Sequence, residues 1–324
     1  MMDISRTTIR DLTGIYIRGL CMGAADAVPG VSGGTIALIT GIYERLIGAL
    51  TAVEPGRIWR LVRGVRYGNR DEAAAAFTEL DIGFLLALGA GIITAIVTVL
   101  RLISVLIATN PVETYGFFFG LIAASAMVMS AEVSLATRGR KVAALSGFLF
   151  AFLISGYVAT TAASTLPLVF LSGAVAVTAM ILPGVSGSLL LLMFGQYKYM
   201  SRTLRAFTDA LVASVSGAGF GQLVAYSVPV VTFLTGGIVG LFTVSHTVRW
   251  ALDRYREATV AFLVSLIVGA LRAPVEQVSL ELVQTGTGWT LPSLGLFLGV
   301  GALGAVAVIA TNYLAGGVDT MQAV

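Results

Sequence analysis

Long apolar runs constrain the fold of this chain more than any other feature of its sequence. Runs of about 20 residues, enough for a helix to cross a bilayer, occur at 82–105, 112–135, 142–160, 226–246, 257–273 and 292–315. A backbone in hydrocarbon must satisfy its own hydrogen bonds, which segments of this length do as α-helices. The 324 residues are 57% hydrophobic and 11% charged, far from a soluble composition. The sequence predicts an all-α polytopic membrane protein with six crossings.

Two further apolar regions, 15–50 and 166–197, are each interrupted near the middle by Pro-Gly. The interruptions read Pro29-Gly30-Val31-Ser32-Gly33-Gly34-Thr35 and Pro183-Gly184-Val185-Ser186-Gly187-Ser188. Pro and Gly end a helix, and the Ser-Gly pair that follows suits the start of another. In a membrane such a break is tolerated where protein surrounds it or where it lines a cavity. Each region is therefore predicted to be a re-entrant hairpin of two half-helices.

The two interruptions share enough positions to indicate a duplicated half. Ser32 and Ser186 are 154 residues apart, and Gly41 and Gly195 keep the same offset, as do the tyrosines two residues further on. Each half would contain one hairpin and three crossings. Because three is an odd number, the second half is predicted to be inverted relative to the first, as in many transporters.

The predicted inverted repeat divides the chain into two parts. The first repeat, 1–160, has the re-entrant hairpin 15–50, an interfacial arginine helix 56–70 and three transmembrane helices. The second repeat, 161–324, has the re-entrant hairpin 166–197 and three transmembrane helices.

Basic residues predict the orientation, because cytoplasmic loops carry an excess of Lys and Arg. Residues that fall on one side in the inverted arrangement are Arg6, Arg10, Arg18, Arg57 to Arg70, Arg138, Arg140, Lys141, Arg249, Arg254 and Arg256. This side is predicted to be the cytoplasm, with both termini on it, in a plasma membrane. Lys198, Arg202 and Arg205 fall on the other side and break the rule. Either the second hairpin is two crossings, or these cations face the outer leaflet for a reason.

Segment 56–70 has a cationic pattern of its own. Arg57, Arg60, Arg63 and Arg66 recur every three residues, with apolar residues such as Trp59 between them. On a helix this gives a cationic stripe beside an apolar face, which is typical of helices that lie on anionic lipids. The same arginines are equally well explained as markers of the cytoplasmic side.

Hydroxyls and backbone N–H groups at the two breaks form the predicted binding site. Its first-half members are Ser32, Gly33, Gly34 and Thr35, and its second-half members are Ser186, Gly187 and Ser188. Helix dipoles and free N–H groups at mid-membrane favour an anion, so a phosphate or carboxylate is the expected ligand.

Asp26 is an ionisable residue inside an apolar segment, a placement that is costly and usually functional. It is predicted either to carry a coupling proton or to pair with a cation such as Arg18 or Arg45. The corresponding residue of the second half is Met180, so the two halves would have unequal roles.

Several functional classes are excluded by composition. One cysteine, Cys21, and one histidine, His246, leave no Cys- or His-rich metal site and no two-histidine phosphatase scheme. No Gly-rich loop ends in Gly-Lys-Ser or Gly-Lys-Thr, which argues against ATP coupling. The net charge of +3 is too small to indicate nucleic acid. We expect no cofactor, with a proton or sodium gradient as a possible energy source.

A family resemblance rests on both motifs and on a few later residues. It is carried by 23–35, 40–46, 181–188, Gly195-Gln196-Tyr197, His246, Ala258-Thr259 and Phe262-Leu263. Together these resemble the PopT-like polyprenyl-phosphate translocases, a family long known only as a domain of unknown function. The resemblance covers nearly the whole chain. It implies a non-enzymatic protein that returns undecaprenyl phosphate, or a related polyprenyl phosphate, from the outer to the inner leaflet for reuse in cell-envelope synthesis.

The resemblance also implies roles for individual residues. The family's motif positions map onto Asp26, Pro29, Ser32, Gly33, Gly34, Thr35, Tyr43, Glu44, Arg45, Pro183, Ser186, Ser188, Gln196 and Tyr197. Tyr43, Arg45, Gln196 and Tyr197 thereby join the predicted substrate-binding set, and Glu44 joins Asp26 as a possible coupling residue. Pro29, Gly30, Pro183 and Gly184 are the helix breaks. Apart from the resemblance, our mechanistic hypothesis is that Lys198, Arg202 and Arg205 gather the head group and the two Ser-Gly breaks hold it. Rocking of the halves would then release it toward Arg45 and the arginines of 57–70.

Three other functions remain as alternatives. An ion-coupled carrier of small organic anions would suit the same broken helices. A polyprenyl-pyrophosphate phosphatase also has a Pro-Gly-x-Ser motif, but there an Arg-Ser pair follows, where this chain has Gly33-Gly34 and Gly187-Ser188. Without that arginine no clamp for a transferring phosphoryl group is evident. A structural scaffold would not explain two matched breaks.

Overall fold

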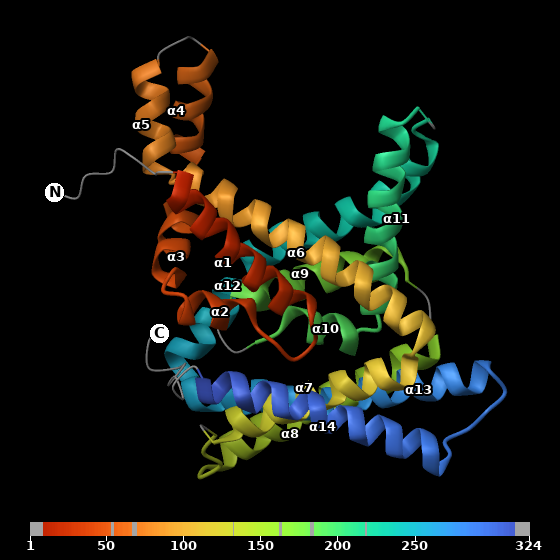
Figure 1. Cartoon of the computed structure of the whole chain (residues 1–324). Helices are drawn as coiled ribbons and strands as arrows, with labels where there is room; N and C mark the ends of the chain where they lie inside the picture. The colour runs from red at the N-terminus through yellow and green to blue at the C-terminus, as the bar shows by residue number, and fades with distance from the viewer. Residues whose placement is uncertain are drawn as a thin grey trace.

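The computed structural model describes residues 9–52, 55–66, 70–131, 133–161, 164–181, 185–217 and 219–314. Within these ranges every regular element is an α-helix (Figure 1). The second predicted helix break, Pro183 and Gly184, lies outside the described residues, as do Arg6 and residues 315–324.

Fourteen helices follow one another in the described ranges. Those of the first half are α1 Ile9–Ala27, α2 Gly33–Ile39, α3 Tyr43–Ala52, α4 Pro55–Arg66, α5 Arg70–Glu79, α6 Ile82–Thr109, α7 Pro111–Ser130 and α8 Arg138–Thr161. Those of the second half are α9 Leu166–Ile181, α10 Gly187–Met193, α11 Tyr197–Val215, α12 Gly221–Ala270, α13 Arg272–Gln284 and α14 Leu291–Leu314. Tyr255, with φ −139° and ψ 44°, interrupts the helical backbone of α12 and marks a kink.

Six helical segments of the described residues are long and apolar enough to cross a membrane, and each overlaps one of the six predicted runs. They are Ile82–Thr109, Pro111–Ser130, Arg138–Gly156, Gly221–Leu241, Trp250–Gln284 and Leu291–Tyr313. The structure thus bears out an all-α protein with six candidate membrane crossings, judged by the length and composition of its helices. A seventh span results if α2 and α3 are counted together, although this pair bends by 116° between Ile39 and Tyr43.

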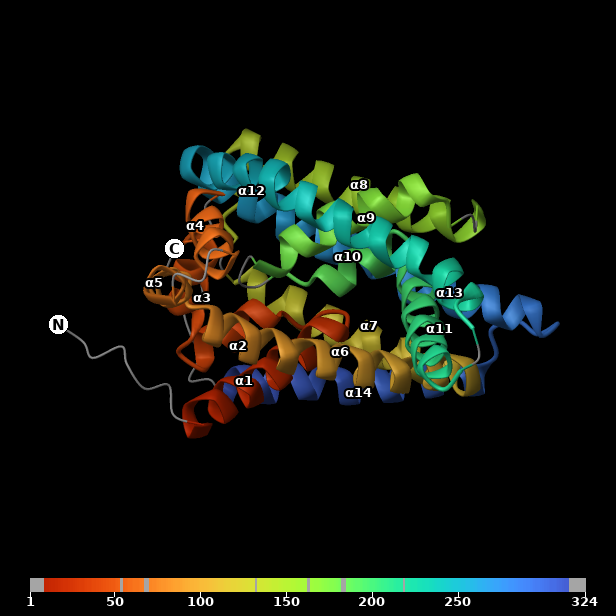
Figure 2. The same cartoon turned by 90° about the horizontal axis from the view of Figure 1, so that it is seen from above.

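The spanning helices run along a common direction, which gives the molecule two ends (Figures 1 and 2). We call the end that holds α4, α5 and the start of α8 the α4 end. We call the opposite end, where α6 is followed by α7 and α13 by α14, the α11 end. The hairpin of α4 and α5 and the helix α11 both project at a steep angle to the spanning helices (Figure 1).

Glycines allow the paired helices to approach closely. A Cβ at Gly91 of α6 would overlap the carbonyl of Tyr16 in α1, and one at Gly236 of α12 would overlap the carbonyl of Phe170 in α9. The pairs α7–α14 and α8–α12 meet in the same way, at Gly120 and Gly147. Small residues at helix contacts are the usual means of association in lipid, where no hydrophobic gain drives it.

The centre of the largest hydrophobic core is formed by α7 and α10. Tyr115, Phe118 and Ile122 of α7 are fully buried, as are Leu189 and Met193 of α10. Half of the most apolar part of α7 is buried, against 17% for α14. Helix α7 is therefore an inner helix, while α14 exposes most of its side chains on the outside, where lipid would surround it.

The predicted interfacial helix 56–70 is shorter than expected. It ends at Arg66 as α4, and Arg70 begins a separate helix, α5. Residues 67–69 between the two helices lie outside the described residues. The two helices pack as a hairpin, in which Arg60 of α4 donates to Glu79 of α5 at 2.8 Å. Arg70 therefore belongs to a different helix from the four arginines of the predicted cationic stripe.

Candidate functional site

From the serine onward, the two motifs adopt nearly the same backbone conformation. Ser32 precedes α2 with φ −111° and ψ 123°, and Ser186 precedes α10 with φ −98° and ψ 116°. Both helices have seven residues. Gly41 and Gly195 follow them with φ of 69° and 64°. The left-handed conformation is readily accessible to glycine, which explains why both sequences place glycine there.

The first motif folds back on Asp26. The backbone N–H of Gly33 donates to Asp26 Oδ1 at 2.8 Å, and the Asp26 side chain is only 5% exposed. A Cβ at Gly33 would overlap this carboxyl group. At the same offset in the second motif, a Cβ at Gly187 would overlap the side chain of Met180. The two glycines thus face equivalent residues, one ionisable and one apolar.

The two motifs also contact each other. The backbone N–H of Gly30 donates to Ser186 Oγ at 3.2 Å, and the hydroxyl of Tyr197 donates to the carbonyl of Ala27 at 2.6 Å. Ser125 of α7 donates to the carbonyl of Gly30 at 2.6 Å. The polar backbone groups freed by the first break are therefore satisfied by the second motif and by α7, as a break in hydrocarbon requires.

We call the place where the two motifs touch, at Ala27, Gly30, Ser186 and Tyr197, the contact region. Ser186 makes more hydrogen bonds than the other side chains of this region. Besides the Gly30 N–H, its hydroxyl oxygen accepts from the N–H of Leu189 at 3.3 Å and lies 3.0 Å from Ser188 Oγ. It is therefore the N-cap of α10 as well as the link to the first motif. The corresponding Ser32 makes no side-chain cap bond to α2.

Some buried polar atoms near the motifs lack a partner among the described residues. They include Ser32 Oγ, Gln196 Oε1 and the hydroxyl of Tyr115. Buried polar groups are nearly always hydrogen-bonded, and an unsatisfied one costs stability. Such groups are candidates for binding a polar ligand. Ser32 and Gln196 belong to the binding site predicted from the sequence, whereas Tyr115 was missed. The sequence marked Tyr115 only by its polar hydroxyl, which falls in the second turn of a predicted transmembrane helix.

Aromatic rings join Tyr115 to the second motif. Tyr115 packs edge-on against Phe118 with ring centroids 6.1 Å apart, and Phe118 packs edge-on against Tyr197 at 5.8 Å. All three are fully or almost fully buried. Through Tyr197, this aromatic row reaches the carbonyl of Ala27 at the first break.

The other predicted site residues are not all gathered at the contact region. Gly34 is buried next to Gly33, and Thr35 and Tyr43 are half-buried. Glu44 is exposed on α3. Arg45 makes two hydrogen bonds to Asp81, at 2.6 and 2.9 Å, and its guanidinium lies 4.4 Å from the ring centroid of Phe84.

Of the two roles considered for Asp26, pairing with a cation such as Arg18 or Arg45 is therefore not observed. Arg45 binds Asp81, and no ion pair of Asp26 is found within the described ranges. Asp81 directly precedes α6, and the packing of α6 against α3 places it beside Arg45. Asp26 instead accepts a hydrogen bond from Gly33 of its own motif. The roles of Arg45 in substrate binding and of Glu44 in coupling stay predictions.

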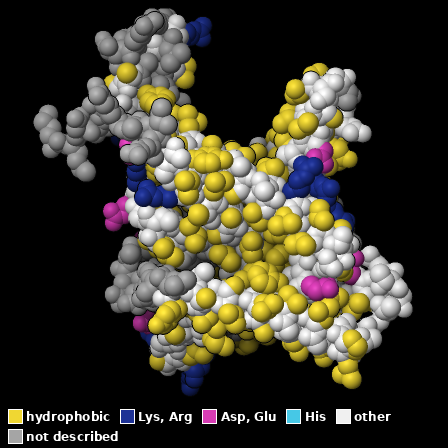
Figure 3. All heavy atoms as spheres, viewed as in Figure 1, with side chains coloured by type: hydrophobic (Ala, Val, Ile, Leu, Met, Phe, Trp, Pro, Cys, Tyr) yellow, Lys and Arg dark blue, Asp and Glu magenta, His cyan; other side chains and the backbone are white. Residues whose placement is uncertain are grey.

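Two open cavities lined by arginines lie at opposite ends. One, of about 200 Å³, is lined at the α11 end by side chains that include Arg202, Arg205 and Asp209. The other, of about 370 Å³, surrounds the α12 kink and includes Arg140 and Arg254. Figure 3 shows Lys and Arg side chains towards both ends of the visible face, with a broad hydrophobic surface between them. In the described part of the chain, no three Cys, His, Asp or Glu side chains form a metal-ligand group.

Comparisons with known proteins agree on one family. A family described as undecaprenyl phosphate translocase-like matches residues 22–288. A polyprenyl-phosphate transporter of Vibrio cholerae is 38% identical over 259 residues, which cover 79% of this chain and 75% of that protein. A polyprenyl-phosphate transporter of Staphylococcus aureus is 27% identical over 270 residues, covering 79% and 84%. No solved structure matches.

Proposed function

Because this chain belongs to the undecaprenyl phosphate translocase-like family, we propose that it moves undecaprenyl phosphate, or a related polyprenyl phosphate, across the cell membrane. The expected direction is from the outer to the inner leaflet, which returns the carrier lipid for another round of cell-envelope synthesis. The proposal is carried by one observation, the partly buried hydrogen bond between the two motifs at Gly30 and Ser186. Near it, inside an otherwise apolar membrane protein, are hydroxyls and buried polar atoms that have no partner among the described residues.

The chemistry of this contact region suits a phosphate head group. Ser32 Oγ is buried without a partner among the described residues, and Ser186 and Ser188 add two hydroxyls. Hydroxyl groups that are already buried can donate to phosphate oxygens without a further desolvation cost of their own. Gln196 would contribute its amide N–H groups, because its amide oxygen can only accept. The long polyprenyl tail would stay in lipid while only the head group enters. The predicted substrate-binding set, from Ser32 to Thr35 and from Ser186 to Ser188, is retained in this proposal.

One N–H group that the sequence assigned to substrate binding is already hydrogen-bonded to Asp26. The N–H of Gly33 already donates to the Asp26 carboxyl group, so an arriving phosphate would compete with this acid. Protonation would weaken the hold of Asp26 on the N–H and remove the repulsion between two anions. We therefore retain Asp26 as the coupling residue, with a proton as the coupling ion and sodium as the alternative.

An inverted repeat would supply the movement. Support comes from the matched backbones of the motifs, and from Gly33 and Gly187, which face residues at the same offset. The helix pairs α1–α6 and α9–α12 add to this, because Gly19 and Gly173 are also 154 residues apart and each contacts its partner helix. Rocking of two such halves about their contact region would expose it to each side in turn.

The α4–α5 hairpin is proposed to lie on anionic lipids at the cytoplasmic face. Trp59 is 67% exposed and Val62 48% exposed, although both are apolar, and Arg60 and Arg63 are exposed beside them. An amphipathic helix with exposed apolar and basic side chains is stable at a lipid surface. The α4 end would then be cytoplasmic and the α11 end would face the other side.

A transport assay with purified protein tests the proposed function. Proteoliposomes would contain labelled undecaprenyl phosphate, and its movement between leaflets would be followed for the wild type and for Ser32→Ala with Ser186→Ala. The matched control is Ser146→Ala with Ser227→Ala, because these exposed serines bond only within their own helices. Transport lost in the first variant and kept in the control supports the proposal. Wild-type transport of small organic phosphates but not of the lipid would favour the small-anion carrier instead.

A further inference from the structure

An open cavity lies between two helices that the sequence places far apart. Its lining residues are Ser104 and Ala108 of α6, and Arg202, Arg205, Ala206 and Asp209 of α11. The volume of about 200 Å³ is several times the space that one water molecule occupies in the liquid, roughly 30 Å³. We call it the α6–α11 cavity.

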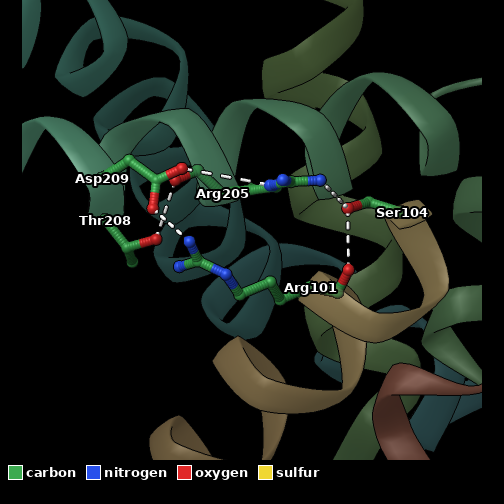
Figure 4. A network of polar contacts seen from close by, with 5 residues as sticks. All are labelled: Arg101, Ser104, Arg205, Thr208 and Asp209. Atoms are coloured by element: carbon green, nitrogen blue, oxygen red, sulfur yellow. Dashed lines mark hydrogen bonds and ion pairs between the residues drawn. The ribbon is translucent and has the colours of Figure 1, made fainter.

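The ion pairs at this cavity leave guanidinium donors unused. Arg101 contacts Asp209 at 2.6 Å, whereas Arg205 Nε lies 3.9 Å from the same carboxylate. Arg205 Nη1 is 3.5 Å from Ser104 Oγ, at the limit of a hydrogen bond. Figure 4 shows Arg101 and Arg205 reaching Asp209 from the two helices, with the far side of the Arg205 guanidinium turned to Ser104. A guanidinium has five N–H donors, so Arg205 has spare capacity.

Arg202 adds a second cation with spare donors. No carboxylate lies within 4.0 Å of its guanidinium in the ranges that the structure covers. The charged residues that line the cavity are Arg202, Arg205 and Asp209, and Arg101 contacts Asp209 from outside the lining. These four side chains together carry a net charge of +2. A phosphomonoester carries up to two negative charges near neutral pH, and arginine binds its oxygens through paired N–H groups.

Apolar side chains beside the cavity favour a lipid over free phosphate. Val105 of α6 is 40% exposed and Val212 of α11 is 67% exposed. Val105 lies three residues before Ala108, and Val212 lies three residues after Asp209 and seven after Arg205, spacings that place them on the helix faces that line the cavity. A lipid could therefore bind its head group in the cavity while its tail contacts these side chains. Inorganic phosphate would gain nothing from them.

We propose that the α6–α11 cavity docks the phosphomonoester head group of a polyprenyl lipid before it enters the protein, an inference that rests on the proposed function. Arg202 and Arg205 are the ligands of the phosphate. Asp209 is the resident anion that the phosphate displaces from Arg205, while Arg101 retains Asp209.

Binding of farnesyl phosphate to the purified full-length protein tests this site. Titrations would compare the wild type with Arg202→Gln/Arg205→Gln and with Asp209→Asn. The matched control is Arg138→Gln/Lys141→Gln, which removes the same charge from exposed positions at the α4 end. Equal thermal unfolding temperatures would show that all variants are folded.

We expect Kd to rise about tenfold or more in Arg202→Gln/Arg205→Gln, because two charge-assisted contacts are lost. Kd should be unchanged in the control and should fall severalfold in Asp209→Asn, which lacks the competing charge. An unchanged Kd in Arg202→Gln/Arg205→Gln would overturn the site. Weaker binding in Asp209→Asn would overturn the displacement step.

Two further arms identify the ligand and separate this inference from the proposed function. Inorganic phosphate that binds as tightly as farnesyl phosphate would show a free-phosphate site and overturn lipid docking. Suppose that the wild type moves undecaprenyl phosphate and that Arg202→Gln/Arg205→Gln moves it with the same half-saturating lipid concentration. The docking site would then be overturned, while the proposed function would stand. If the wild type moves none while the expected Kd pattern holds, the proposed function fails and the cavity stands as a lipid phosphate site.

Discussion

The backbone N–H of Gly30 donates to the hydroxyl oxygen of Ser186 at 3.2 Å, although the two residues are 156 positions apart. This bond joins the helix break of one motif to the N-cap of the other. Because Gly30 has φ of 92°, its N–H is turned out of any helix and needs an acceptor from elsewhere. A change at either residue should therefore affect both motifs together.

Ser186→Ala should destabilise the protein more than Ser188→Ala. It removes the acceptor of the Gly30 and Leu189 N–H groups, and a buried unsatisfied donor costs about 1–3 kcal/mol. Ser188 contributes only its contact with Ser186. The measurement is thermal unfolding in detergent. Equal unfolding temperatures for the two variants would show that the link between the motifs contributes little to stability.

Gly33→Ala should be poorly tolerated, and shortening Asp26 should rescue it. The new Cβ would overlap the Asp26 carboxyl group, which cannot move away without losing its bond to the Gly33 N–H. In Gly33→Ala/Asp26→Ala the overlap is absent. A double-mutant cycle of unfolding free energies should give a coupling of about 1–3 kcal/mol. Additive effects would mean that the two residues do not constrain each other.

Asp26→Asn should remove the dependence of transport on the pH gradient. The amide oxygen can still accept from the Gly33 N–H, so the fold is retained, but the side chain no longer binds and releases a proton. Initial rates in proteoliposomes with and without an imposed pH difference would be compared. Glu44→Gln is the control for the other predicted coupling residue. A pH response kept by Asp26→Asn and lost by Glu44→Gln would assign coupling to Glu44.

Replacing Arg60, Arg63 and Arg66 by Gln should weaken the stimulation of transport by anionic lipids. Each arginine near an anionic surface contributes about 1 kcal/mol to membrane attachment. Lysine at the same three positions preserves the charge and should preserve the stimulation. Rates would be measured in vesicles with and without anionic lipid. If the glutamine variant responds as the wild type does, the arginines mark topology only.

Hydropathy and helix breaking act within short segments, which is why the sequence predicted much of the fold. The six spans follow from runs of apolar residues, and the structure confirms all six. The shared offset of the glycines at 41 and 195 indicated a repeat, and both prove to be left-handed residues at the end of a short helix. Family membership likewise follows from the motifs themselves.

Contacts between distant segments were decided by tertiary packing. No local rule pairs Arg45 with Asp81 instead of Asp26, leaves the Tyr115 hydroxyl without a described partner, or brings Arg205 beside Ser104. Such contacts depend on how α3, α6, α7 and α11 pack in three dimensions. The sequence by itself determined which segments are long and apolar enough to cross the membrane and where the first hairpin breaks, because those properties belong to single helices. Only the tertiary structure decided which polar groups meet at the breaks, because a buried donor takes the acceptor that packing places within reach.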